Sequence, residues 1–353
     1  MAIREIQHTI VVENQEKKVR VDAYLAANIE ELSRTQVSST DAVILVDGKK
    51  VKNSAKVVNG QVIDFSYQLD EFVDLTPYDI PLDVIYEDKD IIAINKEQGL
   101  VVHPGAGNFD GTLVNALVHH IGPSFAEAFK EEVVEAEEDG DDDDEEVQSF
   151  GIDQMRPGVV HRLDKDTSGT MVVALNKDSY YNLVEQFKER TTRKSYIAIV
   201  KGHFTKRRGR IYTNIKRDPK DRKKFTICKD DEGKKADTTY VVLKQYEGFA
   251  LLRVNIHTGR THQIRVHLAS INHPVLGDPI YSKQSKKYKD ATLMLHAIRL
   301  EIDHPVTGEH MVFNSPMPQR FKDVLRPLPS FEQEKGFEDK YYESATKMAN
   351  HKK

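Results

Sequence analysis

One carboxylate stands in a short stretch whose residue types suit catalysis. The stretch reads His161-Arg162-Leu163-Asp164-Lys165-Asp166-Thr167-Ser168-Gly169. Apolar residues precede it at 159–160 and follow it at 170–175, so we expect Asp164 on a loop between two buried strands. Loops on a rigid scaffold often carry catalytic residues, and a carboxylate there can act as a nucleophile or a base. A capping aspartate in a Ser/Thr/Gly turn is the structural alternative.

Two later segments contain further candidate side chains. Residues 193–202 follow a helical pattern at 180–189, and their alternation predicts a strand that carries Tyr196. A strand tyrosine is usually a core residue. Residues 252–281 read as a strand, a Thr-Gly turn, a helix that carries Arg265, and a Pro/Gly loop. The strand and the helix determine where the side chains of Tyr196 and Arg265 lie.

In this order, the three segments resemble the signature of the RluA-type family of RNA pseudouridine synthases. The resemblance implies that Asp164 is the catalytic aspartate, that Tyr196 stacks on the target base, and that Arg265 pairs with the catalytic carboxylate. An aromatic face can hold a base that has been flipped out of the RNA stack, and an arginine keeps a carboxylate ionised. The family also implies that Arg162 occupies the vacated space or contacts a phosphate.

Two more residues complete the expected site. Leu295 resembles the apolar residue that packs beneath the base, and His161 is an expected RNA contact beside Arg162. The reaction would detach uracil, turn it and rejoin it through C5, so we expect no cofactor and no metal. The chain has no Walker-type phosphate loop. Three histidines of the segment 252–281 are spaced five residues apart, which is not a zinc-ligand spacing on one helix face: His257, His262 and His267.

The composition is that of a soluble intracellular protein with a basic folded part. Of 353 residues, 39% are hydrophobic and 30% charged, and Cys228 is the single cysteine. We therefore expect a cytoplasmic protein without disulfides or a membrane segment. The net charge is −5, but residues 131–146 hold twelve acids and no bases, so the remainder carries +7. A basic fold suits a protein that contacts phosphates.

Residues 18–67 look like a separate small module. A helical pattern, a second short amphipathic stretch and an Asp-Gly hairpin follow one another, an order that resembles the S4 RNA-binding domain. Arg34, Lys49 and Lys50 would then contact phosphates. The alternative is a packing module with a solvated basic face.

We expect an α+β fold: the S4-like module, then a pseudouridine synthase domain whose mixed, largely antiparallel sheet is flanked by helices. Residues 68–80 are the predicted linker and 81–328 the catalytic domain. The predicted acidic disordered insertion covers about 126–150, and the tail covers 329–353.

Within the family, the arrangement is most similar to the RluD type, which modifies large-subunit ribosomal RNA. The expected partner is this RNA or the assembling large subunit, and the expected oligomeric state is a monomer. Two alternatives remain: the same chemistry on transfer RNA, and a ribosome-assembly factor whose main role is RNA binding. Three routes also remain for Asp164, namely attack on C1′ of the sugar, attack on C6 of the base, or removal of a proton.

Overall fold

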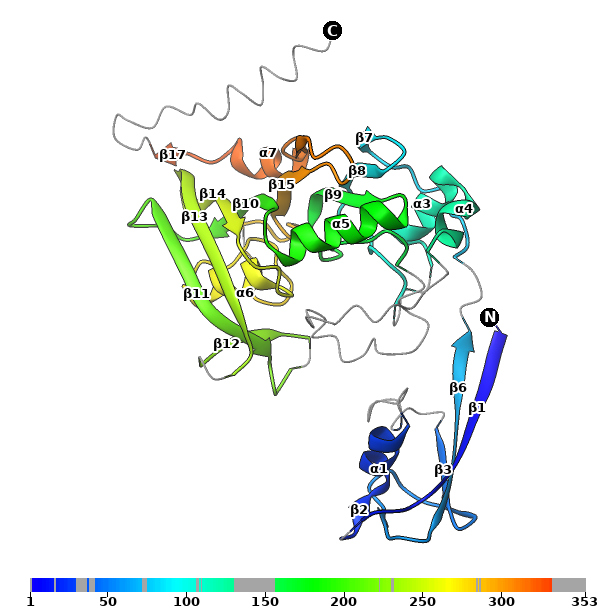
Figure 1. Ribbon diagram of the computed structural model, residues 1–353. Helices are drawn as coiled ribbons and strands as arrows, with labels where there is room; N and C mark the ends of the chain where they lie inside the picture. The colour runs from blue at the N-terminus through cyan, green and yellow to red at the C-terminus, as the bar shows by residue number, and fades with distance from the viewer. Residues whose placement is uncertain are drawn as a thin grey trace. The chain divides into compact units, whose positions relative to one another are not determined.

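The structure is a computed structural model (Figure 1) that describes residues 2–15, 17–29, 37, 42–71, 75–105, 108, 110–129, 156–221, 223–229, 232–283, 285 and 287–331. The chain divides into two compact units. Unit 1 comprises Met1–Lys165, Met171–Glu189 and Asp303–Glu309, and unit 2 comprises Asp166–Thr170, Arg190–Ile302 and His310–Lys353. Arg34, residues 130–155, which include most of the expected insertion, and the tail after 331 lie outside the described residues.

The N-terminal part of unit 1 is an antiparallel sheet with a short helix. The sheet order is β1-β6-β3-β4, and β2 pairs with β5. As expected, Asp47 and Gly48 form the hairpin turn, with φ of 50° and 74°. The core lies between helix and sheet. The elements are β1 (Ala2–Val11), β2 (Val19–Arg20), α1 (Val21–Asn28), β3 (Val43–Val46), β4 (Lys49–Lys50), β5 (Lys56–Val57) and β6 (Val62–Glu71).

Strand pairing in this part extends past the boundaries expected from the sequence. β1 pairs with β6 along its whole length, from Ala2 opposite Glu71 to Val11 opposite Val62. Residues before 18 therefore belong to the sheet, and the first residues of the expected linker belong to β6. Lys49 and Lys50 form β4, and both side chains are exposed.

The rest of unit 1 supports the segment that ends at Lys165. β7 pairs antiparallel with the almost fully buried β8, and Asn176 caps α5 by accepting a hydrogen bond from the Ser179 N–H. Thr112 and Asn115 form a capping box at α3. The elements are β7 (Val84–Glu87), β8 (Ile91–Lys96), α3 (Leu113–Ile121), α4 (Pro123–Glu127), the end of β9 (Ser168–Ala174) and α5 (Lys177–Lys188).

Unit 2 contains a sheet in the order β12-β11-β13-β14-β10-β15, with antiparallel neighbours. The first residues of β9 pair parallel with β15, so the sheet is mixed, as predicted. Figure 1 shows β11 and β13 as long neighbouring strands. The elements are β10 (Arg193–Lys201), β11 (Arg208–Arg217), β12 (Phe225–Cys228), β13 (Lys234–Tyr246), β14 (Phe249–Ile256), α6 (Gln263–Ser270), β15 (Leu295–Asp303), β16 (His310–Asn314), α7 (Gln319–Leu325) and β17 (Ser330–Phe331).

One expected strand is wrong. Residues 159–160 do not form a strand. Instead, Val159 makes a single isolated bridge to Val173. The buried strand predicted after the Asp164 stretch is present as β9, and all seven of its residues are buried. Within the described part of the chain, no helix is long and apolar enough to span a bilayer.

Candidate active site

Asp164 lies on the loop before β9 and is half-buried. The residue after it is fixed to the loop that follows β8. The main-chain oxygen of Lys165 accepts hydrogen bonds from the N–H of Gly99, at 2.8 Å, and from Nζ of Lys96, at 3.1 Å. The loop therefore has a defined backbone position directly beside the candidate carboxylate.

Lys96, the last residue of β8, is a buried cation that holds three loop carbonyls. It is 2% exposed, and its Nζ donates to the oxygens of Glu97 at 2.9 Å, Leu100 at 2.8 Å and Lys165. An ammonium group has three donors, and a charge is retained in a protein interior only with such partners. Lys96 was not among the predicted site residues; its signal in the sequence is a charge at the end of an otherwise apolar strand.

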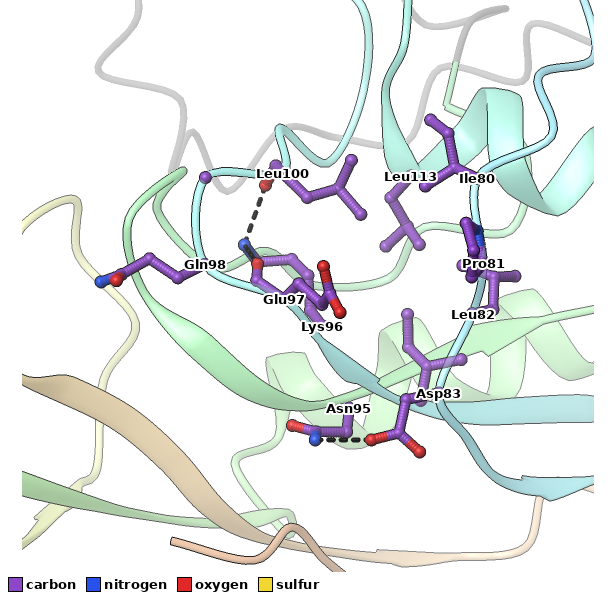
Figure 2. A pocket seen from close by; sticks show the side chains of 12 residues that line it. Ile80, Pro81, Leu82, Asp83, Asn95, Lys96, Glu97, Gln98, Leu100 and Leu113 are labelled. Atoms are coloured by element: carbon purple, nitrogen blue, oxygen red, sulfur yellow. Dashed lines mark hydrogen bonds between the residues drawn. The ribbon is translucent and has the colours of Figure 1, made fainter. Parts of the chain in front are cut away.

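A pocket of about 240 Å³ opens beside Lys96 (Figure 2). Most of its lining comes from two short segments, residues 80–83 and 94–100, with Leu113 of α3. Figure 2 shows Asn95 bonded to Asp83 and Lys96 bonded to the Leu100 oxygen. Among these described lining residues there is none of the predicted site residues, so we assign no substrate to this pocket.

His161 contacts the scaffold of unit 1. Its Nε2 accepts a hydrogen bond from the Val172 N–H, at 3.1 Å, and its ring stacks on Phe187 of α5, with centroids 4.6 Å apart and planes at 21°. These two contacts favour a role in holding the loop against β9 and α5. Direct contact of His161 with RNA remains a prediction.

Arg162 is exposed, and its charge acts on a buried histidine of the same unit. His103 is 8% exposed. Burial, together with the charges of Arg156 and Arg162, lowers the pKa of His103 to about 3. Two guanidinium groups therefore stand near a neutral imidazole.

The start of β9 is fixed within unit 2 by a chain of buried side chains. Nη2 of Arg320, on α7, donates to Oγ of Ser168 at 2.6 Å, and Oγ of Ser168 lies 2.8 Å from Nδ1 of His296. Burial and then the charge of Arg320 lower the pKa of His296 to about 3, so the imidazole that shares this hydrogen bond with Ser168 is neutral. Burial lowers the pKa of Arg320 to about 10.

Gly169 allows the closest backbone approach in this region. It pairs with Ala297 of β15 at φ 123°, and a Cβ on it would lie 2.2 Å from the Ala297 oxygen. Only glycine suits this position. The strand that follows the Asp164 loop is thus locked to β15 by both main-chain and side-chain contacts.

Unit 2 brings three predicted residues to one face of its sheet. Tyr196 lies opposite Ala297 and Leu295 lies opposite Ala198, so both side chains share a face. Val254 of β14 lies opposite Tyr196 of β10 on one side and opposite Tyr240 of β13 on the other. The side chains of Tyr240 and Thr238 are therefore on the same face of the sheet as Tyr196. The helix α6, which carries Arg265, lies on that same face, because its residues His267 and Gln263 bond to Oγ1 of Thr238. Tyr196 is 7% exposed and Leu295 is 3% exposed.

Arg265 is 4% exposed and forms a two-point ion pair with Asp278. Nε donates to Oδ2 at 2.8 Å and Nη2 donates to Oδ1 at 3.0 Å. Asp278 also accepts the N–H groups of Ile280 and Tyr281, and the Tyr281 ring lies 5.3 Å from the guanidinium carbon. A guanidinium has five donors, and the Nε and Nη2 donors of Arg265 are directed at Asp278. The pairing of Arg265, in unit 2, with Asp164, in unit 1, stays a prediction.

Possible metal ligands gather at one place among the described residues: Asp88, Asp90 and His304. Nδ1 of His304 accepts two backbone N–H groups, so Nε2 carries the proton and donates to Asp88 at 2.9 Å. Burial raises the pKa of Asp88, but its donors, led by the Ile91 N–H, outweigh burial and lower it to about 2. The cluster is thus an internally bonded turn, and it does not include His257, His262 or His267.

Comparisons with known proteins agree with the segments singled out above. Residues 90–270 match the family model described as RNA pseudouridylate synthase. A relative from Aquifex aeolicus, named an uncharacterized RNA pseudouridine synthase, is 43% identical over 325 residues, covering 89% of this chain and 94% of the relative. The "Ribosomal large subunit pseudouridine synthase D" of Borreliella burgdorferi is 40% identical over 315 residues, covering 87% and 89%.

A solved structure supports the fold. The chain titled "Human RNA Pseudouridylate Synthase Domain Containing 1" superimposes with a TM-score of 0.54 at 24% identity, covering 77% of this chain and 96% of that one. At this identity the likeness bears on the fold alone. It supports the predicted combination of a mixed sheet with helices.

Proposed function

Because this chain belongs to the RluA-type family of RNA pseudouridine synthases, we propose that it converts specific uridines of large-subunit ribosomal RNA to pseudouridine, with Asp164 as the catalytic carboxylate. The membership confirms the resemblance drawn from the Asp164, Tyr196 and Arg265 segments, and it makes the protein an isomerase. The observation that carries the proposal is the Asp164 loop. Asp164 is half-buried, and the Lys165 oxygen beside it is held by both Lys96 and Gly99.

The proposed reaction breaks the bond between N1 of uracil and C1′ of ribose and forms a bond between C5 and C1′. N1 gains a proton and C5 loses one, so atoms and electrons balance within the substrate. Asp164 is the proposed nucleophile or base for the first step. A uridine stacked in RNA is out of reach, so the base must first be flipped into the site. Exclusion of water protects the cleaved intermediate from hydrolysis.

The residues of unit 2 supply the proposed surroundings of the base. Tyr196 would stack on the uracil while it turns, and Leu295, which lies on the same sheet face, would pack beneath it. Arg265 would orient Asp164 and keep it ionised, since its own position is fixed by Asp278. Arg162, which is exposed, would take the place of the flipped base or contact a phosphate.

The proposed substrate is ribosomal RNA or the assembling large subunit. This part of the proposal is supported by the printed name of the Borreliella relative. It is also supported by the N-terminal module, which we propose to be an S4-like RNA-binding domain whose exposed Lys49 and Lys50 contact phosphates. We propose that the protein acts as a monomer.

The test is to map pseudouridine by mass spectrometry after incubating unmodified large-subunit RNA and transfer RNA with wild-type protein and with Asp164→Asn. We expect pseudouridine in large-subunit RNA with the wild type alone. Asp178→Asn is the matched control, because Asp178 is an exposed acid in the first turn of α5, and it should retain full activity.

The other outcomes separate the alternatives. Modification confined to transfer RNA would keep the chemistry and overturn the proposed substrate. Modification by Asp164→Asn at the wild-type rate would contradict the role of Asp164. Tight binding without modification of either RNA, together with normal ribosome assembly by the Asn variant, would favour an assembly factor.

A further inference from the structure

The segment from 206 to 235 is the strongly basic part of unit 2. It contains thirteen Lys and Arg residues and five Asp and Glu residues. It includes β11, β12 and the start of β13, and among the described residues β12 pairs only with residues 214–217 of β11. The first part of β11 therefore lies at the edge of the sheet. A positively charged edge attracts a polyanion.

Alternation along β11 places three exposed side chains on the same side: Arg208, Arg210 and Tyr212. The opposite side is covered, because Ile215 packs with Val266 of α6 and Thr213 bonds to His267 of α6. Tyr212 is 57% exposed, the largest exposed fraction among the large hydrophobic side chains of the described residues. The row Arg208, Arg210 and Tyr212 thus faces away from α6, on the other side of the sheet from Tyr196.

Arg210 is held in position beside the Tyr212 ring. Its Nε donates to Oδ1 of Asp237 at 2.9 Å and its Nη2 donates to Oδ2 at 2.7 Å, while 63% of its side chain remains exposed. The guanidinium carbon lies 5.5 Å from the centre of the Tyr212 ring. Two flat groups, one aromatic and one cationic, are therefore presented together to solvent with little freedom left to Arg210.

A single exposed apolar side chain needs no function, but this one stands in a basic row beside a fixed guanidinium. Aromatic rings and arginine planes are the surfaces on which unpaired bases stack, and adjacent cations track the phosphates. We propose that Tyr212 and Arg210 form a stacking platform for an unpaired base of the RNA substrate, outside the reactive pocket, and that Arg208 contacts a neighbouring phosphate. This inference deepens the proposed function and rests on it for the nature of the partner.

The test measures the affinity of the full chain for a probe that cannot occupy the uridine pocket. The probe is a single-stranded oligoadenylate of about twelve nucleotides, compared with the same strand paired to oligouridylate. Loss of one base stack weakens single-strand binding by between about fivefold and a hundredfold. We expect that loss for Tyr212→Ala with the single strand and a much smaller change with the duplex, whose bases are already stacked.

Two matched variants separate stacking from other effects. Tyr212→Phe keeps the ring and should bind the single strand as the wild type does. Tyr181→Ala removes a tyrosine of α5 that is also exposed, at 47%, and should leave the affinity unchanged. The same affinity for wild type and Tyr212→Ala, or an equal loss for Tyr181→Ala, would overturn the platform.

Salt dependence distinguishes the stacked base from the phosphate contact. Loss of a single-strand phosphate contact lowers the slope of log K against log salt by about 0.7. We expect this change for Arg208→Ala and an unchanged slope for Tyr212→Ala. A lower slope for Tyr212→Ala would mean that the tyrosine acts by supporting the basic row, which would contradict stacking.

Pseudouridine formation in unmodified large-subunit RNA is measured in parallel. Absence of pseudouridine with the wild type in both free large-subunit RNA and the assembling subunit would contradict the proposed function, whereas the platform is decided by oligoadenylate affinity. With active wild type, Tyr212→Ala should need more RNA to reach half-maximal rate and should reach the same rate at saturation. A wild type that does not bind oligoadenylate would overturn the platform even if it is active.

Discussion

At the scale of single residues, the pair of Arg265 and Asp278 fixes the side chain that is expected to orient the catalytic carboxylate. The side chains of both partners are at most 5% exposed. A buried ion pair adds little net stability, since desolvation offsets the attraction, but removing one partner leaves an uncompensated charge. The pair therefore acts mainly by positioning Arg265, because two hydrogen bonds set the plane of the guanidinium.

Asp278→Asn should therefore impair both stability and catalysis. The free energy of unfolding should fall by about 3 kcal/mol, because the Arg265 charge stays buried without a counter-charge. The single-turnover rate should fall by about a hundredfold, because a small displacement of a positioning group has an effect of that size. Urea unfolding and pseudouridine formation measure the two effects, and Asp290→Asn at an exposed position is the control.

A double variant separates geometry from stability. Arg265→Gln combined with Asp278→Asn removes both charges, so stability should recover relative to Asp278→Asn while the rate stays low. Recovery of the rate along with stability, in a variant that lacks both side chains of the pair, would contradict the role of Arg265 and Asp278 in orienting Asp164.

The sequence predicted the candidate site where a residue's role follows from its own segment. Asp164, Tyr196 and Arg265 could be singled out because each stands in a segment that matches the family. Lys96 and Arg320 were missed, because their roles depend on contacts with distant segments. Asp278 lies only 13 positions from Arg265, and it was missed because the local pattern does not show which residue pairs with Arg265. Arg320 and Ser168 are 152 positions apart, and no local pattern specifies such a partner.

At the scale of secondary-structure elements, the position of the Asp164 loop depends on the elements that hold its two ends. The Lys96 ammonium and the Gly99 N–H hold the Lys165 oxygen. The Arg320 and His296 side chains hold Ser168, and Gly169 pairs closely with Ala297. These points follow Asp164; before it, Nε2 of His161 accepts a hydrogen bond from the Val172 N–H, so the chain is held on both sides of Asp164.

Gly169→Ala should separate β9 from β15. The added Cβ would lie 2.2 Å from a main-chain oxygen of the sheet, so we expect a loss of about 4 kcal/mol or more in the free energy of unfolding, together with a large loss of activity. Gly308 is a matched control, because its φ is also positive, at 71°, with no atom within 4 Å of an added Cβ. Gly308→Ala should lose only about 1–2 kcal/mol. Equal losses in urea unfolding would contradict the steric argument.

The elements with strong local patterns were predicted well. The hairpin at Asp47-Gly48, the strand β9 and the helix α5 each have the expected type, since turn chemistry and apolar spacing act within a few residues. The pairing of β1 with β6 was not foreseen, because β1 takes its partner more than fifty positions away. The apolar pair at 159–160 forms one bridge instead of a strand.

At the scale of the whole molecule, buried neutral histidines link folding to pH. Burial is the largest cause that lowers the pKa of each, to about 3 for His103 and His296 and to about 4 for His267. The charge of Asp237 opposes this at His267, whose two ring nitrogens bond to Thr213 and Thr238. Because the folded pKa lies below the unfolded value of 6.5 in each case, the unfolded chain takes up protons first as pH falls.

The free energy of unfolding should therefore be highest above pH 6.5 and should decrease as the pH falls toward 4. At pH 5 each histidine should contribute a loss of about 2 kcal/mol, that is about 1.4 kcal/mol for each pH unit below 6.5. Urea unfolding at several pH values measures the decrease. In His267→Gln the decrease in the free energy of unfolding between pH 7 and pH 5 should be smaller by the contribution of one histidine. Equal free energies of unfolding of the wild type at pH 5 and pH 7 would contradict the role of the buried neutral histidines.

The single thiol of the chain lies in the strongly basic segment from 206 to 235 of unit 2. Cys228 is half-buried at the end of β12. It lies opposite Asn214 of β11, which is two positions after Tyr212 in the sequence. Its Sγ donates a hydrogen bond to the Glu232 oxygen at 3.0 Å. The chain has no tryptophan. A thiol-reactive dye therefore attaches at one chemically unique position without any substitution, against a background free of indole emission. The natural sequence thus already contains an optical reporter beside the surface proposed to bind unpaired RNA, and energy transfer to a labelled strand would follow binding in real time.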